Sequence, residues 1–280
     1  MIIESIGTPI LYLGFSLLVI FLLAIDFFML KTQGSHRVSV KEAAAWSLGW
    51  IAIALAFGGC FWWYLDGSFG REVANEKTLE YLSGYLIEKS LAVDNVFLWI
   101  TLFSSFAVPT EFQKRVLLYG VLGAIVMRAV LIYFGALLLV HFHWILYIFG
   151  LFLLLTGVKM LVFSTHEPDL EKNPILRWMR GHMTITNEYH GEKFFVWKQG
   201  MRYATPMFVV LVLIEVTDLI FAVDSIPAIF AVTNDPFIVF TSNIFAILGL
   251  RAMYFLLADM ADRFHLLKYG LAAILGGALR

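Results

Sequence analysis

Long apolar segments restrict the folds open to this chain more than any other feature of its sequence. A helix needs about 20 predominantly apolar residues to cross a bilayer. Candidate segments lie at 9–30, 43–65, 79–104, 116–139, 143–163, 206–232, 236–258 and 266–280. Within lipid, only helices and closed barrels satisfy all of their backbone hydrogen bonds. Segments of this length therefore predict an all-α fold, a polytopic transmembrane helical bundle.

The composition agrees with a membrane protein and excludes several other classes. Of the 280 residues, 60% are hydrophobic and 15% are charged, with a formal net charge of −1. A soluble domain has about 25% charged residues. The near-neutral charge gives no indication of a nucleic-acid partner. The single cysteine, Cys60, excludes an intramolecular disulfide or a thiolate metal cluster within one chain.

The distribution of basic residues predicts how the chain is oriented in the membrane. Alternate connections carry the Lys and Arg residues 31, 37 and 41; 114 and 115; 172, 177, 180, 193 and 198; and 263 and 268. Cytoplasmic loops are the ones enriched in Lys and Arg. The N-terminus is therefore predicted outside, and the loop 164–205 in the cytoplasm. In that loop "FFVW", "KQG" and "MRYATP" predict a short hairpin, and His166, His182 and His190 lack metal-ligand spacing.

A short acidic motif occurs twice in the apolar part of the chain. "EKSLAVDNV" begins at Glu88 and "DLIFAVDSI" at Asp218, and each is followed by an arginine beside alanine, Arg128 in "MRAV" and Arg251 in "LRAM". The copies lie on the third and sixth predicted spans, so they should run in opposite directions. This pattern is typical of inverted-topology repeats, which hold a substrate site near the bilayer midplane. A weaker echo, "LLAIDFF", places Asp26 in the first span.

The predicted organisation is a single transmembrane domain over residues 1–280. Two leading helices occupy 9–65, repeat one covers about 79–163, the cytoplasmic loop is 164–205, and repeat two covers about 206–280. Each repeat is expected to contain about three helices. The last segment, from Leu266 to Leu279, is 14 residues long, or about 21 Å of helix. It is therefore expected to be a truncated span.

Helical geometry separates the polar residues of each motif into two groups. Glu88 and Asn95 in the first copy, like Asp218 and Ser225 in the second, are seven residues apart and share one helix face. Asp94 and Asp224, one residue before Asn95 and Ser225 respectively, lie about 100° away from that face. A break in each helix, near Gly84 and near Pro227, would let these aspartates converge with their partner acids.

The polar residues of the spans predict a metal site built from oxygen ligands. Its proposed members are Asp26, Glu88, Asp94, Asn95, Glu215, Asp218, Asp224 and Ser225. A charged side chain at the bilayer centre costs about 2.5–3.5 kcal/mol on insertion scales, so such residues usually have a function. Oxygen ligands suit Mn²⁺, Mg²⁺ and Ca²⁺. Arg128 and Arg251 are interpreted as counter-charges. In the alternative interpretation, the acids only pair with Arg128, Arg251, Lys89 and Lys159 to hold helices together.

Four segments closely resemble the TerC/Alx family of bacterial inner-membrane proteins. They are "GYLIEKSLAVDNVF", "WILYIFGLFLLLTGVKM", "FAVDSIPAIFAVTNDPFIVFTSN" and "FAILGLRAMYFLLA". The family is linked with tellurium resistance, and the Alx-like branch, which this chain resembles most, with Mn²⁺ export. The resemblance implies that the family's acidic membrane residues correspond to Asp26, Glu88, Asp94, Glu215, Asp218 and Asp224 here. It therefore selects manganese from the class of hard cations.

The favoured hypothesis is an inner-membrane transporter that exports Mn²⁺ from the cytoplasm, with protons as the counter-ion. The transported ion is the substrate, and no prosthetic group is expected. The alternative is a membrane scaffold or metal-sensing subunit of the tellurium-resistance type, which binds the cation without transporting it. An enzyme is not expected, since neither HExxH nor GxSxG occurs. The predicted partners are a divalent ion and the bilayer, and a homo-oligomer remains open.

Overall fold

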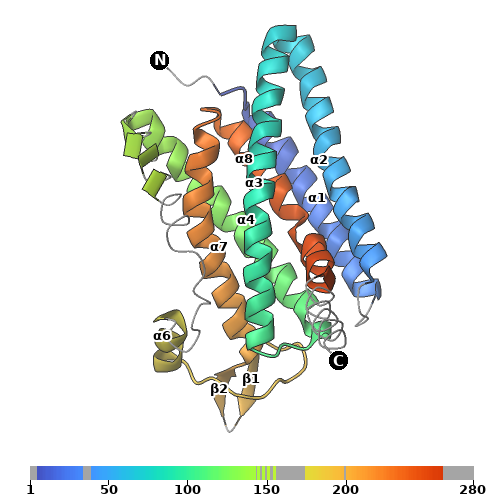
Figure 1. Ribbon diagram of the computed structural model, residues 1–280, viewed down its shortest axis with the longest axis vertical. Coiled ribbons are helices and arrows are strands. Elements are labelled where there is room, and N and C mark those ends of the chain that lie inside the picture. The colour runs from blue at the N-terminus through green and yellow to red at the C-terminus, as the bar shows by residue number, and fades with distance from the viewer. Residues whose placement is uncertain are drawn as a thin grey trace, which may run out of the picture.

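Long helices running side by side make up most of the computed structural model (Figure 1). It describes residues 5–33, 39–142, 144–145, 147–148, 150–151, 154–155, 174–198 and 200–260. The long helices are α1 (Pro9–Gln33), α2 (Val40–Phe69), α3 (Arg71–Ser105), α4 (Thr110–His141), α7 (Pro206–Phe230) and α8 (Pro236–Leu248). A further helix, Leu250–Met260, follows α8. Other elements in the described residues include the short helix α6 (Pro174–His182) and the strands β1 (Phe195–Lys198) and β2 (Met201–Ala204).

Several of these helices are long and apolar enough to cross a membrane. They are Pro9–Phe28, Val40–Phe69, Thr110–Leu139 and Pro206–Phe230, with a fifth span if α8 and Leu250–Met260 are taken as one bent pair. The predicted all-α, multi-pass bundle is thus confirmed. α3 is not in this group, because Glu88, Lys89 and Asp94 interrupt its apolar part. The predicted spans 143–163 and 266–280 lie largely or wholly outside the described residues.

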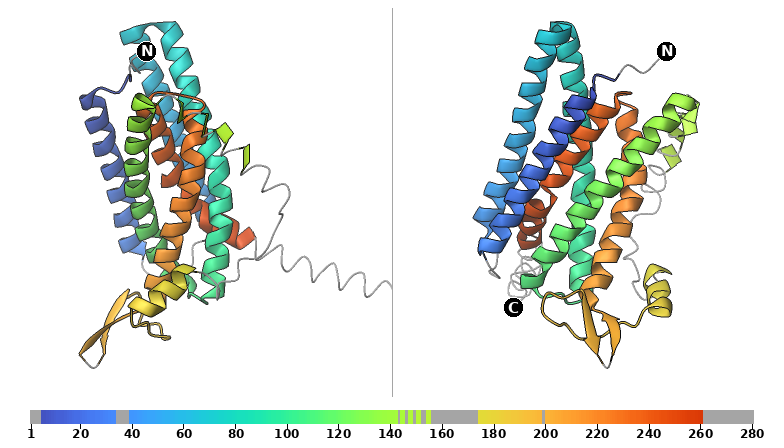
Figure 2. Two further views of the ribbon diagram at one scale, coloured as in Figure 1. Left: turned by 90° about the vertical axis from the view of Figure 1, so that its left-hand side faces the viewer. Right: turned by 180° about the vertical axis from the view of Figure 1, so that it is seen from behind.

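The two helices that carry the acidic motif run in opposite directions, as the sequence predicted. α3 runs toward the end of the bundle where the β-hairpin lies, and α7 starts at that end and runs away from it (Figure 1). The N-terminal end of α1 lies at the opposite end from the hairpin (Figure 2). A complete inverted repeat stays a prediction, since its third helices fall on 143–163 and 266–280.

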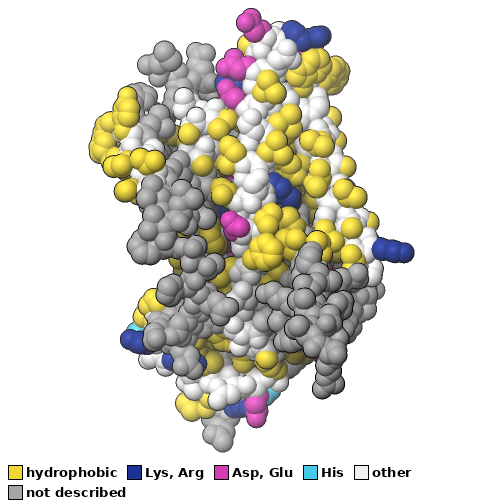
Figure 3. All heavy atoms as spheres, viewed as in Figure 1, with side chains coloured by type: hydrophobic (Ala, Val, Ile, Leu, Met, Phe, Trp, Pro, Cys, Tyr) yellow, Lys and Arg dark blue, Asp and Glu magenta, His cyan; other side chains and the backbone are white. Residues whose placement is uncertain are grey.

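The bundle is apolar on its outside as well as in its core. Large side chains such as Phe21 on α1 (62% exposed) and Trp63 on α2 (76% exposed) face outward. In the view of Figure 3, hydrophobic side chains cover the middle of the surface, and most charged ones lie toward its two ends. α8 is different, since Phe237, Ile244 and Phe245 are all buried. The polar residues Thr241, Ser242 and Asn243 of α8 are buried as well, and α8 packs among α1, α2, α3 and α4.

Local hydrogen bonds explain where two of the helices begin. The Ser39 Oγ accepts a hydrogen bond from the Glu42 N–H at 3.3 Å and so caps α2. Asp235 caps α8, because its carboxylate accepts from the Phe237 N–H at 2.9 Å. The same carboxylate accepts from the Ser5 hydroxyl at 2.8 Å and from the Ile6 N–H at 2.7 Å. Side chains that satisfy the first N–H groups of a helix stabilise its start. Asp235 therefore also fastens the N-terminal segment to the connection between α7 and α8.

The hairpin predicted in the loop 164–205 is confirmed. β1 and β2 pair in antiparallel register, with Phe195 opposite Ala204 and Lys198 opposite Met201. Gly200 lies in the turn with a φ of +77°, a conformation that side chains with a Cβ rarely adopt. His182 is exposed and His190 is partly exposed, and both lie in this loop region as expected. His166 falls outside the described residues.

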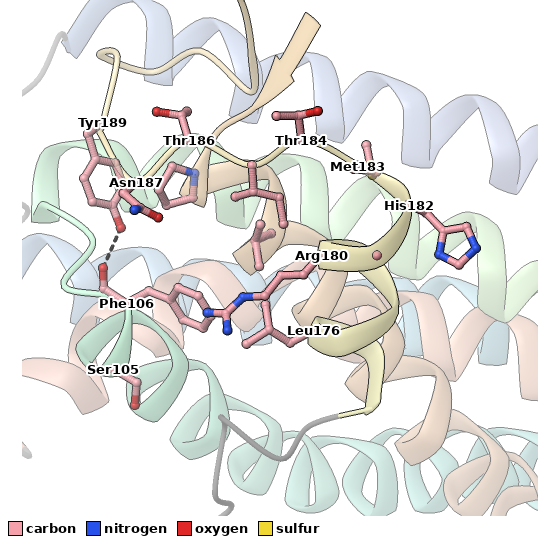
Figure 4. Close-up of a pocket in the computed structure, with 14 residues that line it drawn as sticks. Ser105, Phe106, Leu176, Arg180, His182, Met183, Thr184, Thr186, Asn187 and Tyr189 are labelled. Atoms are coloured by element: carbon pink, nitrogen blue, oxygen red, sulfur yellow. Dashed lines mark hydrogen bonds between the residues drawn. The ribbon is translucent and has the colours of Figure 1, made fainter.

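A cavity of about 860 Å³ lies beside α6 at the hairpin end of the bundle (Figure 4). Tyr189 lines it and donates a hydrogen bond from its hydroxyl to the Phe106 carbonyl at 2.6 Å. Phe106 is the residue that caps the C-terminus of α3. Burial raises the pKa of the Tyr189 phenol, so it stays protonated and able to donate. This hydrogen bond joins the loop after α6 to the end of α3.

Replacing Tyr189 with phenylalanine is expected to loosen this loop while leaving the helices in place. An intramolecular hydrogen bond contributes about 0.5–1.5 kcal/mol net, so the effect should be local. Amide hydrogen exchange across residues 183–194 should become faster in Tyr189→Phe. Tyr203→Phe, which removes a hydroxyl from β2 next to this loop, is the matched control and should leave the exchange of these residues unchanged. Equal protection in both variants would contradict an anchoring role for Tyr189.

Candidate ion-binding site

A buried arginine lies at the meeting point of four helices. Arg128 of α4 has no exposed surface. Its Nη2 donates to Asp218 Oδ1 of α7 at 2.9 Å and its Nε donates to Asp218 Oδ2 at 3.2 Å. Its Nη1 donates to Glu88 of α3 and to Asn243 Oδ1 of α8, the latter at 3.2 Å. Two parallel hydrogen bonds to one carboxylate are among the strongest pairings that a side chain forms.

The polar residues of each motif copy share a buried helix face, as the seven-residue spacing predicted. On α3, Glu88 and Asn95 are 1% and 2% exposed, and on α7 the same values hold for Asp218 and Ser225. The Asn95 Nδ2 donates to Asp218 Oδ1 at 3.3 Å. The two copies of the motif therefore face each other, with the Arg128 guanidinium between Glu88 and Asp218.

Several buried oxygen atoms at this place form no hydrogen bond within the described part of the chain. They are Glu88 Oε2, Asn95 Oδ1 and Ser225 Oγ. Buried polar atoms almost always have a partner, so these three have free capacity for a ligand. In the same described ranges, no group of three or more His, Cys, Asp or Glu side chains is arranged to hold a metal ion. In this conformation the Glu88 and Asp218 carboxylates are held together by their hydrogen bonds to Arg128.

Glu215 lies next to this cluster but forms a different contact. It precedes Asp218 by three residues on α7, and its carboxylate lies directly over Gly123 of α4. A Cβ at position 123 would lie 2.0 Å from that carboxylate, so any larger residue there would displace the Glu215 side chain. The Glu215 Oε2 is buried and has no hydrogen-bond partner among the described residues. Glu215 thus brings a further acid close to the central cluster.

The predicted helix breaks near Gly84 and Pro227 are not observed. α3 is continuous from Arg71 to Ser105, and α7 continues beyond Pro227 to Phe230. Gly84 has another role, because a Cβ there would lie 2.9 Å from the Ser242 Oγ of α8, so the glycine allows close packing. Without a break, Asp94 stays exposed, and Asp224, about 100° from the buried face, is partly exposed.

The helix break occurs instead at Gly249. α8 ends at Leu248, and the helix Leu250–Met260 is bent from it by 43°. The Lys89 Nζ lies 3.4 Å from the Ala246 carbonyl oxygen at this helix end, where the helix dipole favours a cation. A Cβ at position 249 would lie only 2.7 Å from that ammonium nitrogen. Lys89 is therefore held at the C-terminal end of α8.

Asp26 belongs to a second, separate ion pair. This residue of α1 is 6% exposed and accepts a hydrogen bond from Arg251 Nη2 in the helix after α8. Each of the two arginines that follow a motif copy is thus placed against buried acid, Arg128 between Glu88 and Asp218, and Arg251 beside Asp26. The structure does not bring Asp26, Asp94 and Asp224 into the Arg128 cluster.

Asn243 is a member of the cluster that the sequence analysis did not predict. It is fully buried and accepts a hydrogen bond from Arg128. The available signal was a run of three polar residues, Thr241, Ser242 and Asn243, inside an otherwise apolar segment. The first two donate their hydroxyls to the Ile238 carbonyl within α8, at 3.2 and 2.7 Å. Of the three, Asn243 is the one that forms a hydrogen bond to another of the described helices.

The fold and the site together define the class of protein, a multi-pass helical membrane protein with a buried arginine–carboxylate network between its helices. Residues 73–278 match the family described as "Integral membrane protein TerC family", and the chain belongs to that family.

Relatives match almost the whole chain. Proteins of Shigella flexneri and of Escherichia coli (strain K12) named "Putative membrane-bound redox modulator Alx" are each 58% identical over 272 residues, covering 97% of this chain and 85% of the relative. A protein of Myxococcus xanthus named "Uncharacterized membrane protein STKORF319" is 46% identical over 271 residues, covering 97% of this chain and 82% of the relative. No solved structure matches the chain.

Proposed function

We propose that this protein exports a divalent metal ion, Mn²⁺ foremost, from the cytoplasm through the site between α3 and α7. The observation that carries the proposal is the set of buried oxygen atoms without partners among the described residues, on Glu88, Asn95 and Ser225, along the facing sides of α3 and α7 that also carry the buried Asp218 carboxylate. Hard cations such as Mn²⁺, Mg²⁺ and Ca²⁺ prefer carboxylate, carbonyl and hydroxyl oxygens. Polar and charged groups inside a membrane usually mark an ion pathway.

The residues divide into two groups under this proposal. The central ligands are Glu88, Asn95, Asp218 and Ser225, with Glu215 and Asn243 beside them. The remaining predicted acids, Asp26, Asp94 and Asp224, lie outside this group and are proposed to line the path of the ion. Antiparallel α3 and α7 suit transport by movement of one repeat against the other. Protons are the proposed counter-ion, and the proposed location is the bacterial inner membrane with the N-terminus outside.

Flux and binding measurements test this proposal. Purified protein in liposomes is expected to move Mn²⁺, with Mg²⁺ and Ca²⁺ as weaker competitors. Glu88→Gln should lower the flux at least about 10-fold, since even outer-shell partners of a metal cost about 10–100-fold when removed. Glu72→Gln, the same change on an exposed residue in the first turn of α3, is the matched control and should transport normally.

The alternative function is a scaffold or metal sensor that binds the ion without moving it. The cavity beside α6 favours it, because α6 and the loop that follows form an open, partly polar hollow at the hairpin end, suitable for a partner. Mn²⁺ binding without flux, in folded protein, would support this alternative. Absence of both binding and flux would refute a metal site of either kind.

A further inference from the structure

We propose that the Arg128 guanidinium is a tethered cation that occupies the metal position when no metal is bound. On this proposal, which rests on the proposed function, the guanidinium leaves the carboxylates when the ion enters and returns when the ion departs. Arg128 is then more than a permanent counter-charge, because it competes with the substrate. It is a positioning residue that controls the affinity of the site and the return of the empty protein.

The first support is that Arg128 holds carboxylate oxygens of two of the four proposed central ligands, Glu88 and Asp218. Its guanidinium contacts both oxygens of Asp218, one oxygen of Glu88 and the amide oxygen of Asn243. These oxygens come from three helices, α7, α3 and α8, and converge on a side chain from a fourth helix, α4. A cation that links these helices is therefore already present, and it belongs to the chain.

The second support is geometric exclusion. Hard divalent ions bind oxygen at about 2.0–2.6 Å, and several oxygens must converge on one point. The guanidinium instead keeps the Asp218 oxygens 2.9 and 3.2 Å from its nitrogen atoms, and the acids lie on different edges of its plane. Within the part of the chain that the structure describes, no acid group is arranged to hold a metal. Metal and guanidinium cannot occupy the position together.

The third support is the charge balance. Glu88 and Asp218 supply two negative charges, both almost fully buried, and Arg128 supplies one positive charge. Two carboxylates left without a cation inside a membrane protein would be strongly unfavourable. When the metal leaves, the returning guanidinium offsets this cost and lets the empty protein change conformation. Without the arginine, the site would bind its metal more tightly. Once empty, the protein would also return to its starting conformation more slowly.

The test is a comparison of Mn²⁺ affinity and two modes of transport in Arg128→Met. While the Arg128 guanidinium fills the site, only the fraction of protein whose site is open can bind Mn²⁺, and the apparent affinity falls in proportion to that fraction. Removing the guanidinium should therefore tighten Mn²⁺ binding at least about 10-fold. Net Mn²⁺ efflux should fall by a similar factor, while exchange of labelled for unlabelled Mn²⁺ persists. Binding is measured by equilibrium dialysis in detergent, and both fluxes in liposomes.

Arg115→Met is the matched control, because Arg115 lies on the same helix but pairs with Glu192 at the surface, at 3.3 Å. It should change neither affinity nor flux. Arg128→Lys keeps the positive charge and loses the bidentate geometry, so it should bind Mn²⁺ more tightly than wild type and retain part of the net efflux. If Arg128→Met does not fold, the Mn²⁺ affinity and net efflux of Arg128→Lys alone test the proposal.

The outcomes separate this inference from the proposed function. A wild-type protein that neither binds nor moves Mn²⁺ refutes both. A wild-type protein that transports Mn²⁺, combined with folded Arg128 variants that bind it equally or more weakly, overturns the tethered-cation proposal and leaves the transporter standing. Tighter binding with reduced net efflux in Arg128→Met supports the proposal when Arg128→Lys, which keeps the positive charge, also binds Mn²⁺ more tightly than wild type, because loss of a repelling charge cannot then explain the gain.

Discussion

Replacing Asp218 with asparagine should lower the free energy of unfolding by about 3–5 kcal/mol, the usual cost of breaking a buried ion pair, and should abolish the proposed ion transport. The change leaves the size of the side chain almost unaltered but removes the carboxylate that binds Arg128 through two hydrogen bonds. The guanidinium, which has no exposed surface, would retain only Glu88 as a charged partner among the described contacts. Thermal or denaturant unfolding in detergent measures the first effect and liposome flux the second.

Asp66→Asn is the matched control for this prediction. Asp66 pairs with Arg71 at 2.8 Å, but this pair joins α2 to α3 at the exposed end of the bundle, and the arginine side chain is 69% exposed. Surface ion pairs contribute little because water screens them and the side chains lose freedom. The control variant should therefore unfold almost like wild type. A similar loss in both variants would show that burial of the Asp218 pair has no special energetic importance.

Replacing Phe245 with alanine should destabilise the protein by about 3–5 kcal/mol, as large-to-small changes of a buried phenylalanine do. The ring is 1% exposed and lies 5.5, 4.9 and 6.5 Å from the rings of Phe15, Phe57 and Tyr81, measured between centroids. These partners belong to α1, α2 and α3, whereas Phe245 belongs to α8. In a membrane, helix association depends on such packing because lipid is as apolar as the core.

Phe97→Ala tests whether burial causes this effect. Phe97 lies on α3 and is 49% exposed, so its removal should leave no cavity and change the unfolding temperature little. The Phe245→Ala variant should also show faster hydrogen exchange in α1, which packs on Phe245 through Phe15. If both alanine variants unfold at the same temperature, the aromatic cluster does not hold α1 and α2 to the other helices.

The two arginine–carboxylate groups suggest how this bundle tolerates so much buried charge. Glu88 and Asp218 share Arg128, and Asp26 has Arg251. Each pair joins helices that are far apart in the sequence, since Arg128 and Asp218 differ by 90 in residue number and Arg251 and Asp26 by 225. Loss of one partner leaves the other uncompensated, which is why single substitutions here should have larger effects than those at the surface.

Several features of the site could be predicted from the sequence because they depend on local chemistry. The seven-residue spacing placed Glu88 with Asn95 and Asp218 with Ser225, and both pairs are buried. The turn residues predicted the hairpin of β1 and β2. Asn243 was missed, since nothing in a run of polar residues within α8 shows which one faces a neighbouring helix. The break at Gly249 was missed as well. A glycine in a helix does not by itself indicate a break, since Gly84 and Gly123 lie within continuous helices where neighbouring side chains pack closely.

The sequence by itself determined the class of protein, several of the membrane helices and the faces on which the acids lie, because hydropathy and helical periodicity act over a few turns of one segment. Only the tertiary structure decided which of those faces meet. In the tertiary structure Arg128 pairs with Glu88 and Asp218, Asp26 pairs with Arg251, and Asp94 is exposed. The physical reason is that contacts between helices depend on the packing of side chains from distant segments, which no local pattern contains.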